Sequence, residues 1–244
     1  MFRDKEKYFE IEEFKKHNIE ALYTTKEIGN TDLYSEEGWK NLKSFFEKEK
    51  GKEVIIVHSK QTHSDNIIDI KKDTKENFYE NVDGFITNRK DVVLVTKYAD
   101  CLPLYFYDSR LQIIGVSHSG WKGSFKKIGI KTLKTMEENY GSKKDDIIVG
   151  IGIGISCEKY EVGDEFYQNF KDNFDKNIVE RSFKYIDGKW HFNNSVFNKE
   201  IFKNYGIDEK NIFLSDECTF LNNRFNSYRR DKTDKRNIGA IFFK

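Results

Sequence analysis

The chain contains 244 residues, which is long enough to bury a substantial core in one large domain or two small ones. Its 42 lysine and arginine residues balance 41 aspartate and glutamate residues, and the net charge of +1 argues against a nucleic-acid or membrane binder held by bulk electrostatics. No run of about 18 apolar residues occurs, the N-terminus lacks an apolar leader, and the three cysteines are widely spaced. We therefore expect a cytoplasmic monomer that acts on small molecules, with no nucleic-acid or membrane partner.

The N-terminal part of the chain is expected to hold short strands and one clear helix. Residues 8–11 and 21–24 have strand-like patterns in a highly charged segment. Residues 35–50 predict a helix, with Ser35 as its N-cap, glutamates in its first turn and Gly51 as its stop. Apolar positions at helical spacing should face the core: Trp39, Leu42, Phe45 and Phe46.

Two histidines occur in the next segment, which we interpret as strands at residues 54–58 and 66–70 joined by a polar stretch. In one continuous strand His58 and His63 would point to opposite faces, so at most one of them should share a site with Cys101. His63 lies in the polar stretch, where a side chain can reach out, and is the favoured candidate. His58 ends an apolar run, which favours a packed histidine at the edge of the core.

Residues 99–123 have the pattern of a β-hairpin around which the rest of the chain is arranged. Two apolar runs rich in strand-forming residues flank a turn at residues 108–110. If the turn is centred between residues 109 and 110, Cys101 faces His118 directly, with Cβ atoms roughly 4.5 to 5.5 Å apart. Pro103 should stiffen the strand entrance. A thiolate and an imidazole placed in this way could both reach one metal ion, and this donor pair favours zinc or copper.

The same stretch allows two other interpretations of Cys101. A cysteine in an apolar strand is often a buried small hydrophobe with no chemistry. A cysteine that faces a histidine could also be a nucleophile with its base. The hairpin alone leaves the inert, metal-binding and nucleophilic interpretations open.

The remaining elements predict a mixed α/β (α+β) fold in which β-sheets are flanked by helices. Turn chemistry at residues 83–84 and 187–188 and a buried strand at 92–96 suit this architecture. Helices are expected at residues 124–140, 162–174 and 194–205, and a strand begins at residue 147. Because no linker or repeat interrupts the pattern, we expect a single domain over residues 1–244.

A cluster of basic residues lies close to the C-terminus. Six basic side chains fall within thirteen residues: Arg224, Arg229, Arg230, Lys232, Lys235 and Arg236. One interpretation is a solvated surface loop, and the other is an arginine clamp for a phosphate or carboxylate. In an extended segment neighbours face opposite ways, so a clamp that uses Arg230 would leave Arg229 facing away.

The ordered segments KQTH, DGFITN, ADCLP, GVSHSGWKG, CEKYEVGDE and SYRRD carry a family resemblance. Over roughly residues 50–244 the chain resembles the YfiH family, also called the multicopper polyphenol oxidase or laccase-domain family and later described as purine nucleoside phosphorylases. The resemblance implies a single YfiH-like domain, similar to the catalytic domain of a deamidating bacterial toxin. It also implies a metal site made of His63, Cys101 and His118, and places the segment of Arg230 at that site.

Departures from the family pattern are modest. Ser119 replaces the usual alanine and Lys122 the usual arginine, which leaves the ligands untouched. The family's glycine-proline segment is Gly-Ile-Gly at residues 152–154, which affects the local loop shape. We expect Arg230, Gln61 and Lys122 to bind substrate or phosphate, whereas Asp100 is a candidate acid or base only because it adjoins Cys101.

Three protein ligands with an open fourth position describe a catalytic zinc site. The resemblance therefore predicts a zinc-dependent purine nucleoside phosphorylase that cleaves adenosine or inosine with phosphate and has adenosine deaminase side activity. A copper-dependent polyphenol oxidase is the second hypothesis, although the chain has only five histidines. The third is a hydrolase or amidase with Cys101 as nucleophile, acting on a small substrate such as a cell-wall precursor. A non-enzymatic metal-binding module is the fourth.

Overall fold

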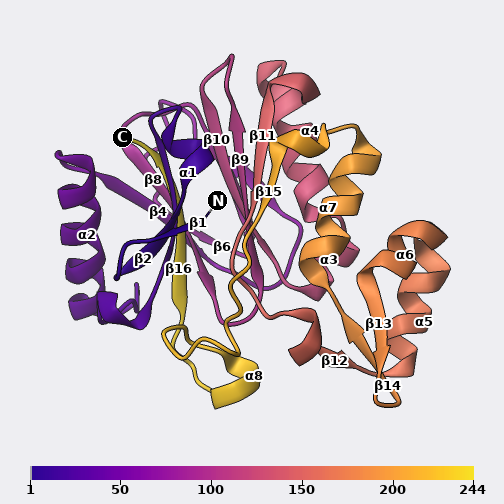
Figure 1. Ribbon diagram of the computed structural model, residues 1–244. Coiled ribbons are helices and arrows are strands. Elements are labelled where there is room, and N and C mark those ends of the chain that lie inside the picture. Colours follow the sequence, from indigo (N-terminus) through magenta and orange to yellow (C-terminus); the bar gives the residue numbers. More distant parts are fainter. Residues whose placement is uncertain (1) are drawn as a thin grey trace.

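The computed structural model describes residues 2–244 and contains two large β-sheets that face each other. In sheet order, the seven-stranded sheet consists of β1 (Phe2–Asp4), β2 (Tyr8–Ile11), β3 (Ile19–Thr24), β16 (Asn237–Phe243), β8 (Val92–Tyr98), β4 (Ile55–Lys60) and β6 (Phe78–Glu80). The six-stranded sheet consists of β15 (Ile212–Leu214), β11 (Ile147–Ile151), β9 (Leu102–Asp108), β10 (Ile113–Ser119), β7 (Gly84–Thr87) and β5 (Ile67–Asp69). The sheets form the middle of the molecule (Figure 1).

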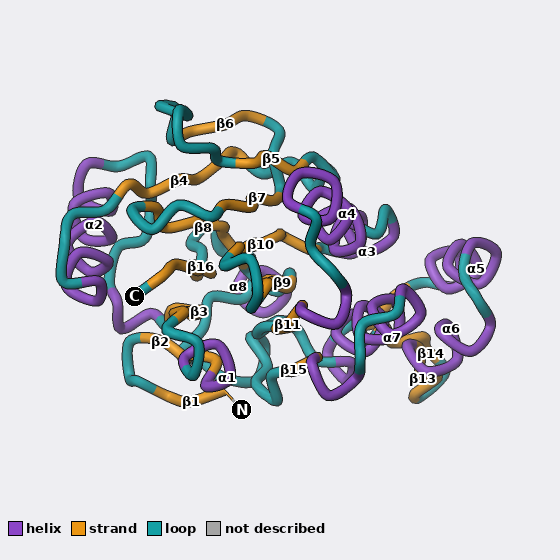
Figure 2. The backbone as a smooth tube through the Cα atoms, turned by 90° about the horizontal axis from the view of Figure 1, so that it is seen from above, coloured by secondary structure: helices purple, strands orange, loops and turns teal. Residues whose placement is uncertain are grey.

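Helices cover the outer faces of both sheets, so the molecule has four layers (Figures 1 and 2). Helix α2 (Glu36–Lys50) covers the seven-stranded sheet, and α4 (Ile128–Tyr140) and α7 (Asn194–Tyr205) cover the six-stranded sheet. The predicted mixed α/β fold class is confirmed. No helix among residues 2–244 is long and apolar enough to cross a membrane.

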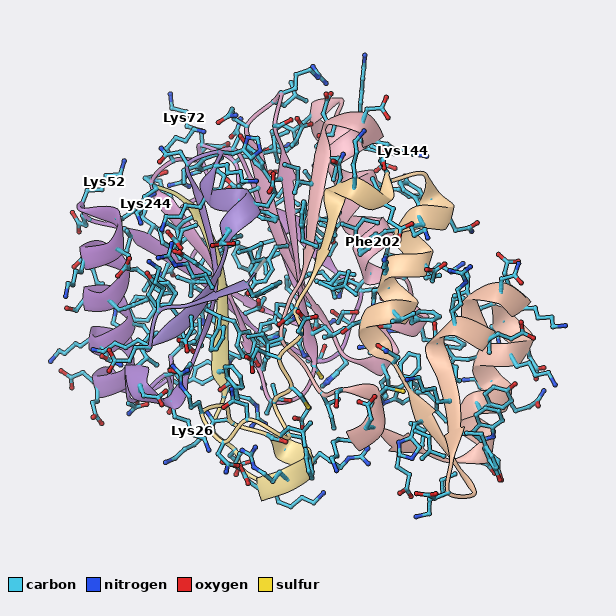
Figure 3. The ribbon with its side chains drawn as sticks, viewed as in Figure 1. Lys26, Lys52, Lys72, Lys144, Phe202 and Lys244 are labelled. Carbon is cyan, nitrogen blue, oxygen red and sulfur yellow. The ribbon has the colours of Figure 1, made fainter. Side chains whose placement is uncertain are left out.

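The four layers explain why the central strands are continuously apolar. In β8, Val93 and Val95 pack toward α2, whereas Leu94 packs between the two sheets. In β9, Phe106 packs toward the helices on the other side, and Tyr105 packs between the sheets. A strand that is buried on both faces has no polar side to show, so its sequence reads as an apolar run. Figure 3 shows Phe202 of α7 between that helix and the six-stranded sheet.

The predicted N-terminal helix is confirmed together with its caps. Helix α2 begins after Ser35, whose side chain accepts a hydrogen bond from the amide of Gly38, and ends at Gly51 in the left-handed conformation with φ of 70°. Leu42 and Phe46 are buried on its inner face. The short strand predicted at residues 8–11 is also confirmed as β2.

The central hairpin exists, but the predicted register is wrong by two residues. Strands β9 and β10 pair Asp108 with Ile113 and Pro103 with His118. Cys101 therefore does not face His118 directly and lies just before β9, opposite Gly120. The error comes from the connection between the strands, which is longer than a turn centred at residues 109 and 110 because the Asp108 carboxylate accepts hydrogen bonds from the amides of Arg110 and Leu111.

Two other segments differ from the predictions. The helix expected at residues 124–140 is divided into α3 (Trp121–Phe125) and α4, because Lys127 adopts a left-handed conformation with φ of 57°. The segment around Arg230 is not extended, since residues Tyr228–Asp231 form the short helix α8. Short elements with little periodicity were not predicted: α1 (Glu12–Lys15), α6 (Lys176–Ser182), β1, β6 and β15.

A smaller unit packs beside α3 and α7, at the right of Figure 1. It holds α5 (Asp164–Asn173), α6 and a three-stranded sheet of β12 (Glu161–Val162), β14 (Lys189–Phe192) and β13 (Phe183–Ile186). Phe170 and Phe192 join its interior to the core beneath the six-stranded sheet. Strand β12 and helix α8 lie at the same end of the molecule, the lower end in Figure 1.

Candidate metal centre and its pocket

Three predicted ligands meet at one end of the sheets. His63 lies in the loop between β4 and β5, Cys101 lies between β8 and β9, and His118 lies near the end of β10. One donor atom from each of the three side chains lies within 4.8 Å of the other two. The Sγ atom of Cys101 is 3.7 Å from Nε2 of His63. The structure therefore brings together the three residues that sequence reasoning grouped, although not through the predicted register.

The buried carboxylate of Asp83 connects two of the three candidate ligands, His63 and His118. Its carboxylate accepts hydrogen bonds from the amides of Thr62, His63 and Ser64 at 3.1, 3.1 and 2.8 Å. The same carboxylate lies 2.8 Å from Nδ1 of His118 and is completely buried. An acceptor on Nδ1 fixes the tautomer of the ring and leaves Nε2 as the ligand atom. One side chain thus holds the His63 loop and orients His118.

The three ligand side chains influence one another's protonation. Burial raises the pKa of the Cys101 thiol, but His118 and His63 more than offset it and bring the pKa to about 6. Burial lowers the pKa of His118, but Cys101 and Asp83 raise it to about 9. Burial also raises the pKa of Asp83, yet its hydrogen bonds with His118 and Ser64 hold it below the ordinary value. The shifted pKa values favour a thiolate at Cys101 beside a positively charged imidazole at His118.

The donor set is of the kind that holds a zinc or copper ion. One sulfur and two imidazole nitrogens are common zinc ligands, and a Zn–S bond of about 2.3 Å and a Zn–N bond of about 2.0 Å at a tetrahedral angle separate sulfur from nitrogen by roughly 3.5 Å. The observed 3.7 Å between Cys101 Sγ and His63 Nε2 agrees with this value. Histidine ligands almost always donate the other ring N–H to a carboxylate, a backbone carbonyl or water, and Asp83 provides such a contact to His118.

Two backbone features hold the ligands close together. His63 and Asp100 adopt positive φ angles of 58° and 86°, which are uncommon for residues other than glycine and often occur at functional sites. Gly120 allows the close approach, because a Cβ atom there would lie 2.7 Å from the His63 ring and 2.8 Å from Cys101 Sγ. In addition, the Asp65 carboxylate ties the His63 loop to Lys126, which follows α3, and to Lys131 of α4.

A pocket of about 150 Å³ opens beside Cys101. Its wall combines aromatic rings with a few polar groups, as small-molecule sites do. Besides Cys101, the lining residues are Ala99, Asp100, Gly120, Trp121, Ile155, Tyr160, Asn194, Tyr228 and Arg229.

Arg229 lines this pocket, and Arg230 is not among its lining residues. The Arg230 guanidinium donates hydrogen bonds to Asp231 and to the carbonyl oxygens of Thr219, Phe220 and Phe225, at 2.7 to 2.8 Å. The predicted geometry, with Arg230 facing the site and Arg229 facing away, is therefore wrong. It assumed an extended segment, and the chain forms helix α8 there.

Two other candidate residues, Gln61 and Lys122, also lie outside the pocket lining. The side-chain amide of Gln61 exchanges two hydrogen bonds with the backbone of Lys97, at 2.8 and 3.0 Å. Lys122 is exposed, with Nζ 5.6 Å from the centre of the Trp121 ring. Asp100 lines the pocket, but its two carboxylate oxygens accept hydrogen bonds from the Thr219 hydroxyl and the Arg229 amide. This bonding favours a structural role for Asp100 over an acid or base.

Sequence reasoning missed several residues of the site. Asp83 was interpreted only as part of a turn, although a charged residue between the apolar Val82 and the buried strand β7 could have indicated a buried, partnered carboxylate. Asn194 comes from a segment far away in the chain, and no local pattern connects it with Cys101. Tyr228 and Arg229 lie in the SYRRD segment that the family resemblance placed at the site, but neither was assigned a role there.

A model of the family described as multi-copper polyphenol oxidoreductase laccase matches residues 32–244. The chain belongs to this family. A protein named purine nucleoside phosphorylase from Borreliella burgdorferi is 41% identical over 175 residues, which are 72% of this chain and 74% of that protein. A protein named adenosine deaminase RL5, from an unknown prokaryotic organism, is 31% identical over 173 residues, 67% of this chain and 65% of that protein.

The fold is shared with solved structures of this laccase-domain family. The crystal structure of the hypothetical protein YfiH from Bacillus licheniformis superposes with a TM-score of 0.88 at 26% identity, covering 100% of this chain and 99% of that chain. The predicted family resemblance is therefore confirmed over more of the chain than the segments that first carried it.

Proposed function

We propose that this protein is a zinc-dependent purine nucleoside phosphorylase that cleaves adenosine or inosine with phosphate and also deaminates adenosine. The observation that carries the proposal is the convergence of His63, Cys101 and His118 beside a pocket that also contains Arg229. The names of the two relatives support the substrate class. The protein would work as a cytoplasmic monomer, and size-exclusion chromatography tests its oligomeric state.

The residues of the chain have distinct roles in this proposal. His63, Cys101 and His118 would hold the zinc ion, and Asp83 would keep the His118 ring in the ligand tautomer. Zinc bound there would supply a Lewis acid and lower the pKa of a water molecule to about 7. Tyr160 lines the pocket and carries a hydroxyl that can orient a nucleoside, whereas the buried Asn194 amide is bonded to Ser119 and Ser124.

Arg229 is our candidate for binding the phosphate, in place of Arg230. Its guanidinium donates one hydrogen bond to the carbonyl oxygen of Glu161 at 3.2 Å and lies 5.4 Å from the centre of the Tyr160 ring. Its remaining N–H groups have no protein acceptor among residues 2–244. An arginine can bind a phosphate through two parallel hydrogen bonds, whereas the Arg230 guanidinium already donates to protein oxygens.

A second candidate function uses Cys101 as a nucleophile. Cys101, His118 and Asp83 have the order of groups found in cysteine hydrolases, in which a histidine is oriented by a third residue. This arrangement favours the hydrolase or amidase hypothesis only if the protein works without metal. Metal dependence therefore separates the two candidates.

The test uses protein that has been stripped of metal and reloaded with zinc or copper. Zinc should restore phosphate-dependent release of free base from adenosine and inosine. Cys101→Ala should lose both the metal and the activity, because two ligands make a much weaker site. Cys157→Ala is the matched control, since Cys157 is buried outside the pocket and should keep both.

Three results would contradict the proposal. Full activity of the stripped protein that disappears in Cys101→Ala would support the hydrolase instead. Oxygen uptake with a phenol, restored only by copper, would support a polyphenol oxidase. Stoichiometric zinc and full turnover in Cys101→Ala would remove Cys101 from the metal site.

A further inference from the structure

Tyr228 has an unusual place on the surface of the protein. Among residues 2–244, six large apolar or aromatic side chains are exposed: Tyr34, Ile55, Phe78, Tyr185, Leu221 and Tyr228. Tyr228, with 52% of its surface exposed, is the one of these six that lines the pocket beside Cys101. An exposed ring at a pocket offers apolar area that a ligand can cover.

The pocket is too small to enclose a whole nucleoside. Ligand pockets that bury drug-sized molecules usually measure roughly 300 to 1,000 Å³, whereas this pocket measures about 150 Å³. A nucleoside whose reacting end lies near Cys101 must therefore extend past the enclosed part. Tyr228 is the exposed aromatic ring at this pocket.

The backbone that carries Tyr228 is firmly anchored, although the ring is exposed. Ser227 caps helix α8 through the amide of Arg230, and the amide of Arg229 donates to the Asp100 carboxylate at 2.7 Å. The Arg230 guanidinium binds the carbonyl oxygens of residues 219, 220 and 225. A ring on a fixed backbone loses little conformational freedom when a ligand binds, which favours recognition. These bonds also explain why Arg230 is turned away from the pocket.

We propose that Tyr228 is the stacking platform for the planar base of the substrate and determines its specificity for nucleosides. The inference rests on the proposed function for the identity of the ligand. A nucleobase presents a π face to the tyrosine ring, and alanine substitutions of such stacking residues commonly weaken binding by about five- to hundredfold. The ribose and phosphate would then lie in the enclosed part, close to Arg229 and Cys101.

Equilibrium binding on the zinc-loaded protein tests this role. Adenosine and ribose 1-phosphate are the two probes, because the second lacks the base. Tyr228→Ala should weaken adenosine binding by about five- to hundredfold and change ribose 1-phosphate binding by less than about twofold. Tyr228→Phe keeps the ring and should rescue adenosine binding, whereas Tyr228→Leu keeps only apolar bulk and should not. The zinc content should stay the same throughout.

Steady-state phosphorolysis gives a second measurement. Tyr228→Ala should raise KM for adenosine much more than it lowers kcat, because stacking contributes equally to the ground state and the transition state. Tyr185→Ala is the matched control, since Tyr185 is also an exposed tyrosine, 62% exposed, but is not among the lining residues.

The outcomes separate this inference from the proposed function. If the wild-type protein shows no phosphorolysis but binds adenosine in a Tyr228-dependent way, the proposed function is wrong and the stacking role of Tyr228 is supported. If phosphorolysis occurs and Tyr228→Ala keeps the wild-type KM for adenosine, the stacking role is wrong and the proposed function is supported. Equal weakening of both probes, rescue by Tyr228→Leu, or no adenosine binding by the wild type would each overturn the platform.

Discussion

Two side chains outside the pocket lining, Asp83 and Arg230, organise different parts of the site. Asp83 is a completely buried acceptor, and its carboxylate binds three amides of the His63 loop and the ring of His118. Arg230 is a half-buried donor, and its guanidinium binds Asp231 and the carbonyl oxygens of three residues before α8. The first holds ligands, and the second holds the segment that carries Arg229 and Tyr228.

Asp83 and Arg230 differ in the part of the site that each holds in place. Asp83 touches a candidate metal ligand directly, so its charge and its shape both affect the chemistry. Arg230 acts only through the backbone of its neighbours, so its loss should change the pocket and leave the ligands alone. A change at Asp83 should therefore lower the metal content, whereas a change at Arg230 should affect the pocket and leave the metal content unchanged.

The largest effect is expected from Asp83→Asn. The side chain keeps its size, but an amide group must face the backbone amides of residues 62–64 and can no longer stabilise charge on His118. Loss of such a contact typically lowers metal affinity by about 10- to 100-fold. An unsatisfied buried group also costs about 1–3 kcal/mol of unfolding free energy. Zinc competition with a chelator and urea unfolding measure the two effects.

Asp108→Asn is the matched control for Asp83. Asp108 is also completely buried and its carboxylate accepts hydrogen bonds from two amides, at 2.8 and 2.9 Å, but it lies at the opposite end of the central hairpin. Because one oxygen, Oδ1, accepts both bonds, Asp108→Asn can keep them and should keep its zinc affinity. Equal zinc affinity in Asp83→Asn and the wild type would show that Asp83 does not support the metal ligands.

An intermediate effect is expected from the Arg230→Ala and Arg229→Ala pair. Arg230→Ala leaves carbonyl oxygens without donors and should lower the unfolding free energy by about 1–3 kcal/mol, with zinc content unchanged. Arg229→Ala should leave stability almost unchanged and raise KM for phosphate about tenfold or more, because a charge-assisted hydrogen bond contributes about 1.5–3 kcal/mol. Chemical unfolding and phosphate titration of both variants separate anchoring from binding. The assignment fails if Arg230→Ala remains fully stable and loses phosphate binding directly.

The sequence predicted those parts of the fold that depend on local patterns. Helix α2 has a cap, a stop and an apolar stripe in one continuous segment, and all three occur as expected. The hairpin register depended on a turn whose length is set by the Asp108 side chain, and a period-two pattern cannot reveal such an insertion. Helix α8 is held by bonds from Arg230 to distant carbonyl oxygens, which no local propensity encodes.

The site was predictable to a different degree from the fold. His63, Cys101 and His118 have side chains that are typical of metal sites, so residue type and family segments were enough to group them. Arg229 and Arg230 have the same side chain, and only the helical conformation of residues 228–231 decides which of them lines the pocket. Residue type therefore predicts which side chains can bind a metal, whereas the tertiary structure decides which side chain faces the pocket.

The smallest effect concerns His58, a buried polar group that lacks the partners of Asp83 and Arg230. Its Nδ1 atom is buried without a hydrogen bond, and its ring lies against the rings of Tyr34, Trp39 and Phe78. Burial, with a smaller contribution from Lys97, lowers the pKa of His58 to about 4. The prediction that His58 is a packed histidine is confirmed, since it is 6% exposed.

This pKa gives His58 a defined effect on acid stability. Because the pKa is lower in the folded chain than in the unfolded chain, about 6.5, the unfolded state binds the proton more readily between pH 6.5 and about 4. The unfolding free energy should therefore fall as the pH is lowered through this window, by roughly 1 kcal/mol at pH 5.5 for this residue. In His58→Gln, which cannot be protonated, the loss of unfolding free energy between pH 7.5 and 5.5 should be smaller by that amount. Urea unfolding at the two pH values measures it, and an unchanged difference would show that His58 is already protonated in the folded protein or stays neutral in both states.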